Sequence, residues 1–395
     1  MRVTRCLSLF LSLAAVSCGS AQAPAPSAVN KGQALRVAFV SPAAVQPEAK
    51  SPATIWFDDF EQPGDPRQRY FEPADDASGL TPSAEAAYAG RGRGLKTQFE
   101  KGDVTRGGLK MTFGRNPLGA KVRPNEDFHE IYWRIYVQHE PGWVGNPAKL
   151  GRAICFAGPN WSEGLIGHVW GGTGDVLCID PATGITNSKL VTTEYNDFAH
   201  LRWLGKIDGK TPLFSTAESG RWVCVESRVK VNTPGKKDGV FNLWVDGKLE
   251  ASHTDLDWHG TWDAYAINAV CIENYWNQGA TKREARYFDN FVISTQPIGP
   301  IVAANPPVVT RTVVDVSGWE AQVATSPEGT DVVWASKMLP GRQTSVTVDG
   351  QSGTFAGSRQ GQTSLAPGGT YWLRVRAQGT DAWSDWHAPF RTAAK

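Results

Sequence analysis

The feature that most constrains the fold is an alternation of apolar and polar residues with a period of two. It recurs in residues 129–137, 222–231, 240–247 and 268–275, and such a period is typical of β-strands with one buried face. No segment of useful length has the helical period of 3.6. The 395 residues also include 41 Gly and 16 Trp, which favours many turns. The sequence therefore predicts an all-β protein.

The alternation assigns each side chain in these segments to one face of its strand. The apolar face of the first segment carries Ile131, Trp133, Ile135 and Val137. The opposite faces carry polar and aromatic side chains at Tyr132, Arg134, Tyr136, Cys224, Glu226, Arg228, Asn242, Trp244, Glu273 and Tyr275. If the four strands share a sheet, this face is a groove suited to an anionic or hydroxylated polymer. A plain solvent-exposed face is the alternative.

The N-terminus has the pattern of an export signal. Arg2 and Arg5 precede the apolar run 7–16, which is too short to span a bilayer. The residues Ala15-Val16-Ser17-Cys18 resemble a bacterial lipobox, which makes Cys18 a candidate lipidation site. Cleavage after Ala23 is the alternative. We therefore expect an exported protein, either a cell-surface or outer-membrane lipoprotein or a secreted one, with a lipid anchor as its one membrane contact.

The remaining chain divides by composition. Residues 1–23 are the expected signal peptide, and 24–50 are an Ala/Pro-rich tether. Residues 51–299 form a large domain, and Gly, Asn and Pro mark 300–307 as a hinge. Residues 308–395 contain short β-runs between Gly/Pro turns and form a small separate domain.

Export makes disulfides an expectation. Cys155, Cys178, Cys224 and Cys271 remain after the signal is removed, and an even number of cysteines in an exported chain predicts two bridges in one of three connectivities.

The charge balance argues against nucleic acid as a partner. Lys and Arg number 40 against 39 Asp and Glu, and no basic stripe is visible. We expect a monomer that requires no cofactor, because zinc and phosphate-loop motifs are lacking. Asp58, Asp59 and Asp289 could join a structural Ca²⁺ site if the end strands pair. Solvated strand-end acids are the alternative.

Connected motifs carry a family resemblance. Trp222–Glu226, Val231–Gly235 and Leu243–Lys248 together resemble the central hairpin of concanavalin A-like jelly-roll polysaccharide lyases, in particular families fourteen and twenty, the alginate and glucuronan lyases. Residues 56–61 and 287–294 resemble the first and last strands of that superfamily. In the small domain, Leu365–Tyr371 and Trp383–Trp386 resemble a fibronectin type III domain with its tyrosine corner.

The resemblance implies β-elimination on a uronate-containing glycan. This chemistry needs a cation or amide to neutralise the uronate carboxylate, a base for the C5 proton and an acid for the leaving oxygen. The resemblance then places Arg134 or Arg228, assisted by Asn242, as neutraliser. It makes the base and acid a choice among Tyr132, Tyr136 and Tyr275. Lys149, His168 and Trp244 are expected to border the groove and contact the glycan.

Two other functions stay open. Glu226 and Glu273 could act as the paired carboxylates of a glycoside hydrolase, although the family-sixteen Glu-x-Asp-x-x-Glu signature is absent. They could also be ion-pair partners of Arg228 and Arg134. The second alternative is a non-catalytic glycan-binding or adhesive surface protein, since tryptophans in loop-like stretches can stack on sugar rings.

Overall fold

The computed structural model describes residues 38–71, 79–312 and 314–394. The expected signal peptide, Cys18 and residues 24–37 of the expected tether lie outside this part of the chain. The described residues form β-strands and five short 3-10 helices, which confirms the all-β prediction. The helices are η1 (Pro47–Lys50), η2 (Pro66–Arg69), η3 (Ala84–Ala86), η4 (Tyr88–Gly90) and η5 (Gly357–Arg359).

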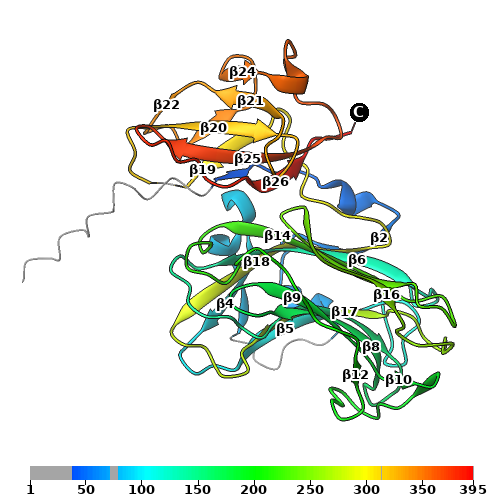
Figure 1. Ribbon diagram of the computed structural model, residues 1–395. Coiled ribbons are helices and arrows are strands. Elements are labelled where there is room, and N and C mark those ends of the chain that lie inside the picture. Colours follow the sequence, from blue (N-terminus) through cyan, green and yellow to red (C-terminus); the bar gives the residue numbers. More distant parts are fainter. Residues whose placement is uncertain (1–37, 72–78, 313, 395) are drawn as a thin grey trace, which may run out of the picture. The chain divides into compact units, whose positions relative to one another are not determined.

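The large domain is a sandwich of two antiparallel sheets (Figure 1). Sheet I contains, in order, β16 (Lys248–Leu256), β15 (Gly239–Val245), β14 (Trp222–Lys230), β6 (Glu130–His139), β18 (Glu284–Ser294), β4 (Gly94–Phe99) and β3 (Leu80–Ser83), with β2 (Thr54–Asp58) on β18. Sheet II contains β12 (Arg202–Trp203), β9 (Leu177–Thr183), β8 (Glu163–Gly171), β7 (Lys149–Phe156), β17 (Ala269–Tyr275) and β5 (Thr105–Thr112), with β13 (Ile207–Asp208) on β9. A separate hairpin pairs β10 (Ile185–Thr186) with β11 (Lys189–Leu190).

The core between the sheets follows the alternation in the sequence. Trp133, Val225 and Leu243 from sheet I and Val169 and Ile272 from sheet II are all buried in one hydrophobic cluster. The side chains that the sequence placed on the apolar faces therefore do face the core. Burial of such side chains stabilises each by about 1.5–3 kcal/mol relative to exposure.

The expectation that four polar faces share one sheet is wrong. β6, β14 and β15 are neighbours in sheet I, whereas β17 lies in sheet II between β7 and β5. The period of two determines which face of a strand is buried, but strand pairing is a long-range choice that alternation leaves undetermined.

The small sandwich also has two sheets. One contains β1 (Ala38–Val40), β19 (Val308–Arg311) and β23 (Ser345–Thr347). The other contains β24 (Gly353–Phe355), β21 (Val332–Ser336), β20 (Gly318–Ala324), β25 (Thr370–Ala377) and β26 (His387–Arg391), with β22 (Leu339–Pro340) on β20. Tyr371 accepts a hydrogen bond on its hydroxyl from the N–H of Ala366, 2.9 Å away, as in a tyrosine corner. Because β1 lies within residues 24–50, the expected tether contributes a strand to this sandwich.

The four cysteines outside the signal are free thiols, so the two expected disulfides are absent from the described residues. The thiols are buried in different places: Cys155 in the main core, Cys224 against sheet I and Cys271 against sheet II. Cys178 lies on β9, with its sulfur 3.6 Å from the Gly171 carbonyl oxygen. A disulfide needs its two Cβ atoms within about 4.5 Å. Cys178 and Cys271 share the outward face of sheet II, but β9 and β17 are three strand steps apart, and Cys155 and Cys224 lie in other clusters.

Within the described residues, no helix has the length and apolar character needed to cross a membrane.

Candidate functional site

The polar face of sheet I is covered by the chain that follows β18. Glu226 accepts hydrogen bonds from the N–H groups of Ile298 and Gly299 at 2.9 and 2.8 Å. The Tyr136 hydroxyl accepts one from Ile301 N–H at 3.0 Å. Arg134, with no exposed surface, donates to the Gly299 carbonyl at 2.8 Å. These expected groove residues are therefore a buried polar layer.

Burial also shifts the titration of this layer, and the Glu226 carboxylate is already bound by two backbone N–H groups. Burial raises the pKa of the Glu226 carboxyl, and it raises the pKa of the Tyr136 hydroxyl well above its usual value. Arg134 forms an ion pair with Glu48 of η1, whose Oε1 lies 3.6 Å from the Arg134 Nη1. Buried charges persist when paired and hydrogen-bonded, so the layer has a structural explanation.

The remaining expected residues of sheet I make local contacts. Arg228 Nε lies 2.7 Å from Glu130 Oε1, and the Tyr132 hydroxyl donates to the same oxygen at 3.0 Å. Burial raises the pKa of Tyr132 to about 12. Asn242 donates to Ser252 Oγ at 2.8 Å, and Trp244 packs against a cluster that includes Ile298. None of these contacts brings them to Glu273 or Tyr275.

The outward face of sheet II instead gathers the chemically versatile side chains. Lys149 on β7 lies opposite Tyr275 on β17 and Trp170 on β8. One row further along β7, Arg152 lies opposite His168 on β8 and Cys271 on β17. Of the residues expected from the sequence, the structure therefore brings together Lys149, His168, Glu273 and Tyr275.

Arg152 is the centre of a buried ionic cluster. Its Nη2 lies 3.0 Å from Glu273 Oε1, and its Nη1 lies 3.4 Å from Glu163 Oε1. The guanidinium also donates to Asn196 Oδ1 at 3.0 Å and to the Tyr195 hydroxyl. Burial disfavours its charge, but Glu273, Tyr195 and Glu163 outweigh that and raise the pKa of Arg152. The cluster holds Arg152 between two carboxylates that compensate its charge.

Lys149 and Tyr275 form the second part of the site. The Lys149 ammonium lies 4.6 Å from the centroid of the Tyr275 ring. Burial lowers the pKa of Lys149, and the nearby Glu273 carboxylate opposes that shift. A bulge in β17 between Glu273 and Tyr275 changes the register here, and bulges re-aim side chains in this way.

His168 lies beneath an aromatic surface. Its Nδ1 is 3.0 Å from the Asp180 carbonyl oxygen, and its ring stacks on Trp170 with centroids 4.1 Å apart. Burial, and then the charge of Arg152, hold its pKa well below the usual value. His168 is therefore a neutral, buried support for the rings around it.

Sequence reasoning missed Arg152, Glu163, Tyr195 and Asn196. A signal existed for Arg152, because it is the one charged residue in the otherwise uncharged, strand-like run 150–156. Tyr195 and Asn196 lie in a long connection between strands, and no periodicity marks such residues.

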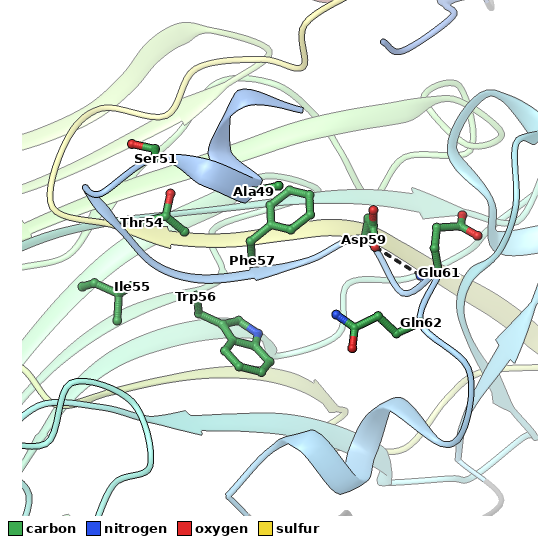
Figure 2. A pocket seen from close by; sticks show the side chains of 9 residues that line it. All are labelled: Ala49, Ser51, Thr54, Ile55, Trp56, Phe57, Asp59, Glu61 and Gln62. Atoms are coloured by element: carbon green, nitrogen blue, oxygen red, sulfur yellow. Dashed lines mark hydrogen bonds between the residues drawn. The ribbon is translucent and has the colours of Figure 1, made fainter. Parts of the chain in front are cut away.

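A pocket of about 600 Å³ lies along β2, and Figure 2 shows its lining. The Glu61 N–H donates to Asp59 Oδ1 at 3.3 Å in this pocket. Asp58, Asp59 and Asp289 are the candidate calcium ligands. The Asp58 Oδ1 lies 2.6 Å from Nη2 of Arg69. Asp289 accepts from the Tyr88 N–H at 2.7 Å. Across the described residues, no three His, Cys, Asp or Glu side chains are grouped to hold a metal ion.

No protein-family model and no curated protein match the sequence. Among solved structures, the chain is similar to the alginate lyase vAL-1 from Chlorella virus, with a TM-score of 0.41, 16% identity and coverage of 57% of this chain and 91% of that one. It is also similar to an endo-β-1,4-glucuronan lyase from Trichoderma reesei (TM-score 0.41, 12% identity, 62% and 96% covered). A third similar structure is the alginate lyase from Aplysia kurodai, with a TM-score of 0.41, 15% identity and coverage of 62% of this chain and 99% of that one. These TM-scores lie below 0.5, so the functional assignment depends on the side chains themselves.

Proposed function

We propose that the protein is a polysaccharide lyase that cleaves a uronate-containing glycan by β-elimination on the outward face of sheet II. The observation that carries the proposal is the Lys149–Tyr275 pair, with the Lys149 ammonium 4.6 Å from the Tyr275 ring centroid. The Arg152 cluster lies on the same face. An amine, a phenol and a fixed cation are the three kinds of group that this elimination needs.

Each group has a role in the proposed reaction. Neutral Lys149 removes the C5 proton of the uronate, the electron pair forms the C4–C5 double bond, and the C4–O bond breaks. The Tyr275 hydroxyl donates its proton to the leaving oxygen. The Lys110 ammonium, 4.0 Å from the Trp161 ring centroid, supplies positive charge toward the uronate carboxylate, while Arg152 fixes the position of Glu273 on this face. The lowered pKa of Lys149 favours its neutral form.

A specific observation supports glycan binding without catalysis as the second candidate. Arg152 already has two carboxylates, Glu163 and Glu273, within 3.4 Å, so its charge is largely compensated. In contrast, Glu226 and Glu273 are not placed to act as the paired carboxylates of a hydrolase. These residues lie in different sheets, and the Glu226 carboxylate already accepts hydrogen bonds from two backbone N–H groups.

Four further proposals concern the rest of the chain. The small sandwich is proposed to be a fibronectin type III domain, supported by the Tyr371–Ala366 hydrogen bond. Cys18 is proposed to carry a lipid anchor. We also propose that the protein is exported and acts as a monomer on its glycan.

The test separates elimination from binding. The protein lacking residues 1–23 is incubated with alginate, glucuronan, pectate, hyaluronan and neutral glucans. Ultraviolet absorbance of the unsaturated uronate and release of reducing ends are followed together. We expect both signals from a uronate polymer, and a loss of at least about 100-fold in Lys149→Arg, since a guanidinium stays protonated. Tyr275→Phe keeps the ring under Lys149 but removes the acid.

Lys237→Arg is the matched control, because Lys237 is exposed in the turn between β14 and β15. Reducing ends without absorbance would contradict elimination. Binding without either signal would favour the second candidate.

A further inference from the structure

Three aromatic rings lie close together in nearly parallel planes at the β12 side of sheet II. The rings of Phe198 and Trp203 are 8° from parallel with centroids 6.4 Å apart, and those of Trp203 and Trp170 are 26° from parallel at 5.7 Å. Trp203 is 42% exposed and Phe198 is 50% exposed. We call Phe198, Trp203 and Trp170 the aromatic platform.

The platform is held from below. His168 stacks on Trp170 and on Trp203, with centroids 4.1 and 5.4 Å apart. Its ring is fixed through Nδ1, which lies 3.0 Å from the Asp180 carbonyl oxygen. Trp203 pairs through its backbone with Ala182 on β9. The rings are thus pre-organised in nearly parallel planes, which lowers the entropic cost of binding a flat ligand.

The charges around the platform differ from those at Lys149. Asp180 and Asp208 lie on this side, and the Lys206 Nζ is 3.2 Å from Asp208 Oδ1. Asp180 retains hydrogen-bond acceptors for hydroxyl groups. A uronate placed here would meet like charge, whereas a neutral sugar would gain both stacking and hydrogen bonds.

We infer that the aromatic platform is a subsite for an uncharged sugar ring, so that the substrate is a heteropolysaccharide combining uronate and neutral sugars. This inference rests on the proposed function for its uronate half. The platform strand β12 is three strand steps from β7, which carries Lys149. The platform extends from Trp170, which lies opposite Lys149, to β12, which at about 4.8 Å a step is about 14 Å from β7 across the sheet. One glycan chain can therefore occupy both places.

The test is calorimetric binding to three soluble probes, made with the protein lacking residues 1–23. The probes are cellohexaose, which is neutral, a glucuronan hexamer, which is all uronate, and a hyaluronan hexasaccharide, in which uronate and neutral sugars alternate. We expect Trp203→Ala to weaken binding of cellohexaose and the hyaluronan hexasaccharide about tenfold. Binding of the glucuronan hexamer should change less than about twofold. Asp180→Asn should raise affinity for the glucuronan hexamer, because it removes the like charge.

The matched control is Trp383→Ala, a half-buried tryptophan in the small sandwich, which should leave all three affinities unchanged. Equal weakening of all three probes by Trp203→Ala, or no weakening at all, would overturn the inference. Failure of the proposed function looks different. If the protein cleaves no polymer but binds the neutral-containing probes through Trp203, the subsite stands and the elimination does not.

Discussion

The backbone N–H of Ala38 donates to Nε2 of His387, 3.1 Å away and 349 positions later in the sequence. Ala38 begins β1, which pairs with β19, and Val40 at its end is fully buried in the core of the small sandwich. A segment that precedes the whole large domain thus completes a domain that follows it. Folding of the small sandwich therefore depends on residues near the other end of the chain.

We predict that Val40→Asp destabilises the small sandwich by more than about 3 kcal/mol, because it buries a carboxylate without a partner. Denaturant unfolding followed by tryptophan fluorescence measures the change, since Trp319 and Trp334 lie in that core. The control is Val45→Asp, because Val45 is 59% exposed and its change should be nearly neutral. Equal stability of the two variants would show that β1 is dispensable.

His387 predicts how the stability depends on pH. Burial lowers its pKa below the usual 6.5, and its Nδ1 lies 2.8 Å from the Asp385 carbonyl oxygen. The unfolded chain therefore binds a proton at His387 more readily than the folded chain does. The resulting stabilisation is present above about pH 6.5 and is lost as the pH falls below it.

The measurement compares the free energy of unfolding of the wild type and His387→Gln between pH 7.5 and pH 5. The wild type should lose more on acidification, with an extra slope of up to about 1.4 kcal/mol per pH unit. Parallel curves would mean that His387 titrates alike in both states.

The buried position of Arg152 predicts that its replacement lowers the free energy of unfolding much more than replacement of an exposed arginine. Arg152→Met leaves Glu163 buried without its cation and should cost about 3–5 kcal/mol. Arg115 makes an exposed ion pair with Asp127, 2.9 Å away, and Arg115→Met should cost less than about 1 kcal/mol. Thermal and urea unfolding of both variants provide the comparison, and similar losses would contradict the buried network.

Replacement of Glu273 is expected to shift the pH profile of the proposed reaction. Its carboxylate opposes the lowering of the Lys149 pKa, so Glu273→Gln should lower that pKa further. The acid limb of kcat/KM, which reports the neutral base, should then move to lower pH. Glu100→Gln is the control, since Glu100 is half-exposed and pairs with Arg283 at 3.0 Å. A shift in the opposite direction would exclude Lys149 as the base.

The sequence by itself determined the local features of this protein. The period of two identified the strands and their core faces, and Ile131, Trp133 and Val225 lie in the core as predicted. The family resemblance, together with strand parity, pointed to a larger set of site residues, of which Lys149, His168, Glu273 and Tyr275 lie on one face of sheet II. These features depend on neighbouring residues and on side-chain chemistry, both of which can be read directly from the sequence.

The tertiary structure alone decided which strands share a sheet and which polar face is covered. Residues 298–301 cover Arg134, Tyr136 and Glu226, and β17 joins β7 and β5 rather than β14. Strand pairing and the path of a covering segment depend on contacts between residues far apart in the chain. The same alternating pattern is compatible with several such arrangements, and only the packing of the whole chain selects one.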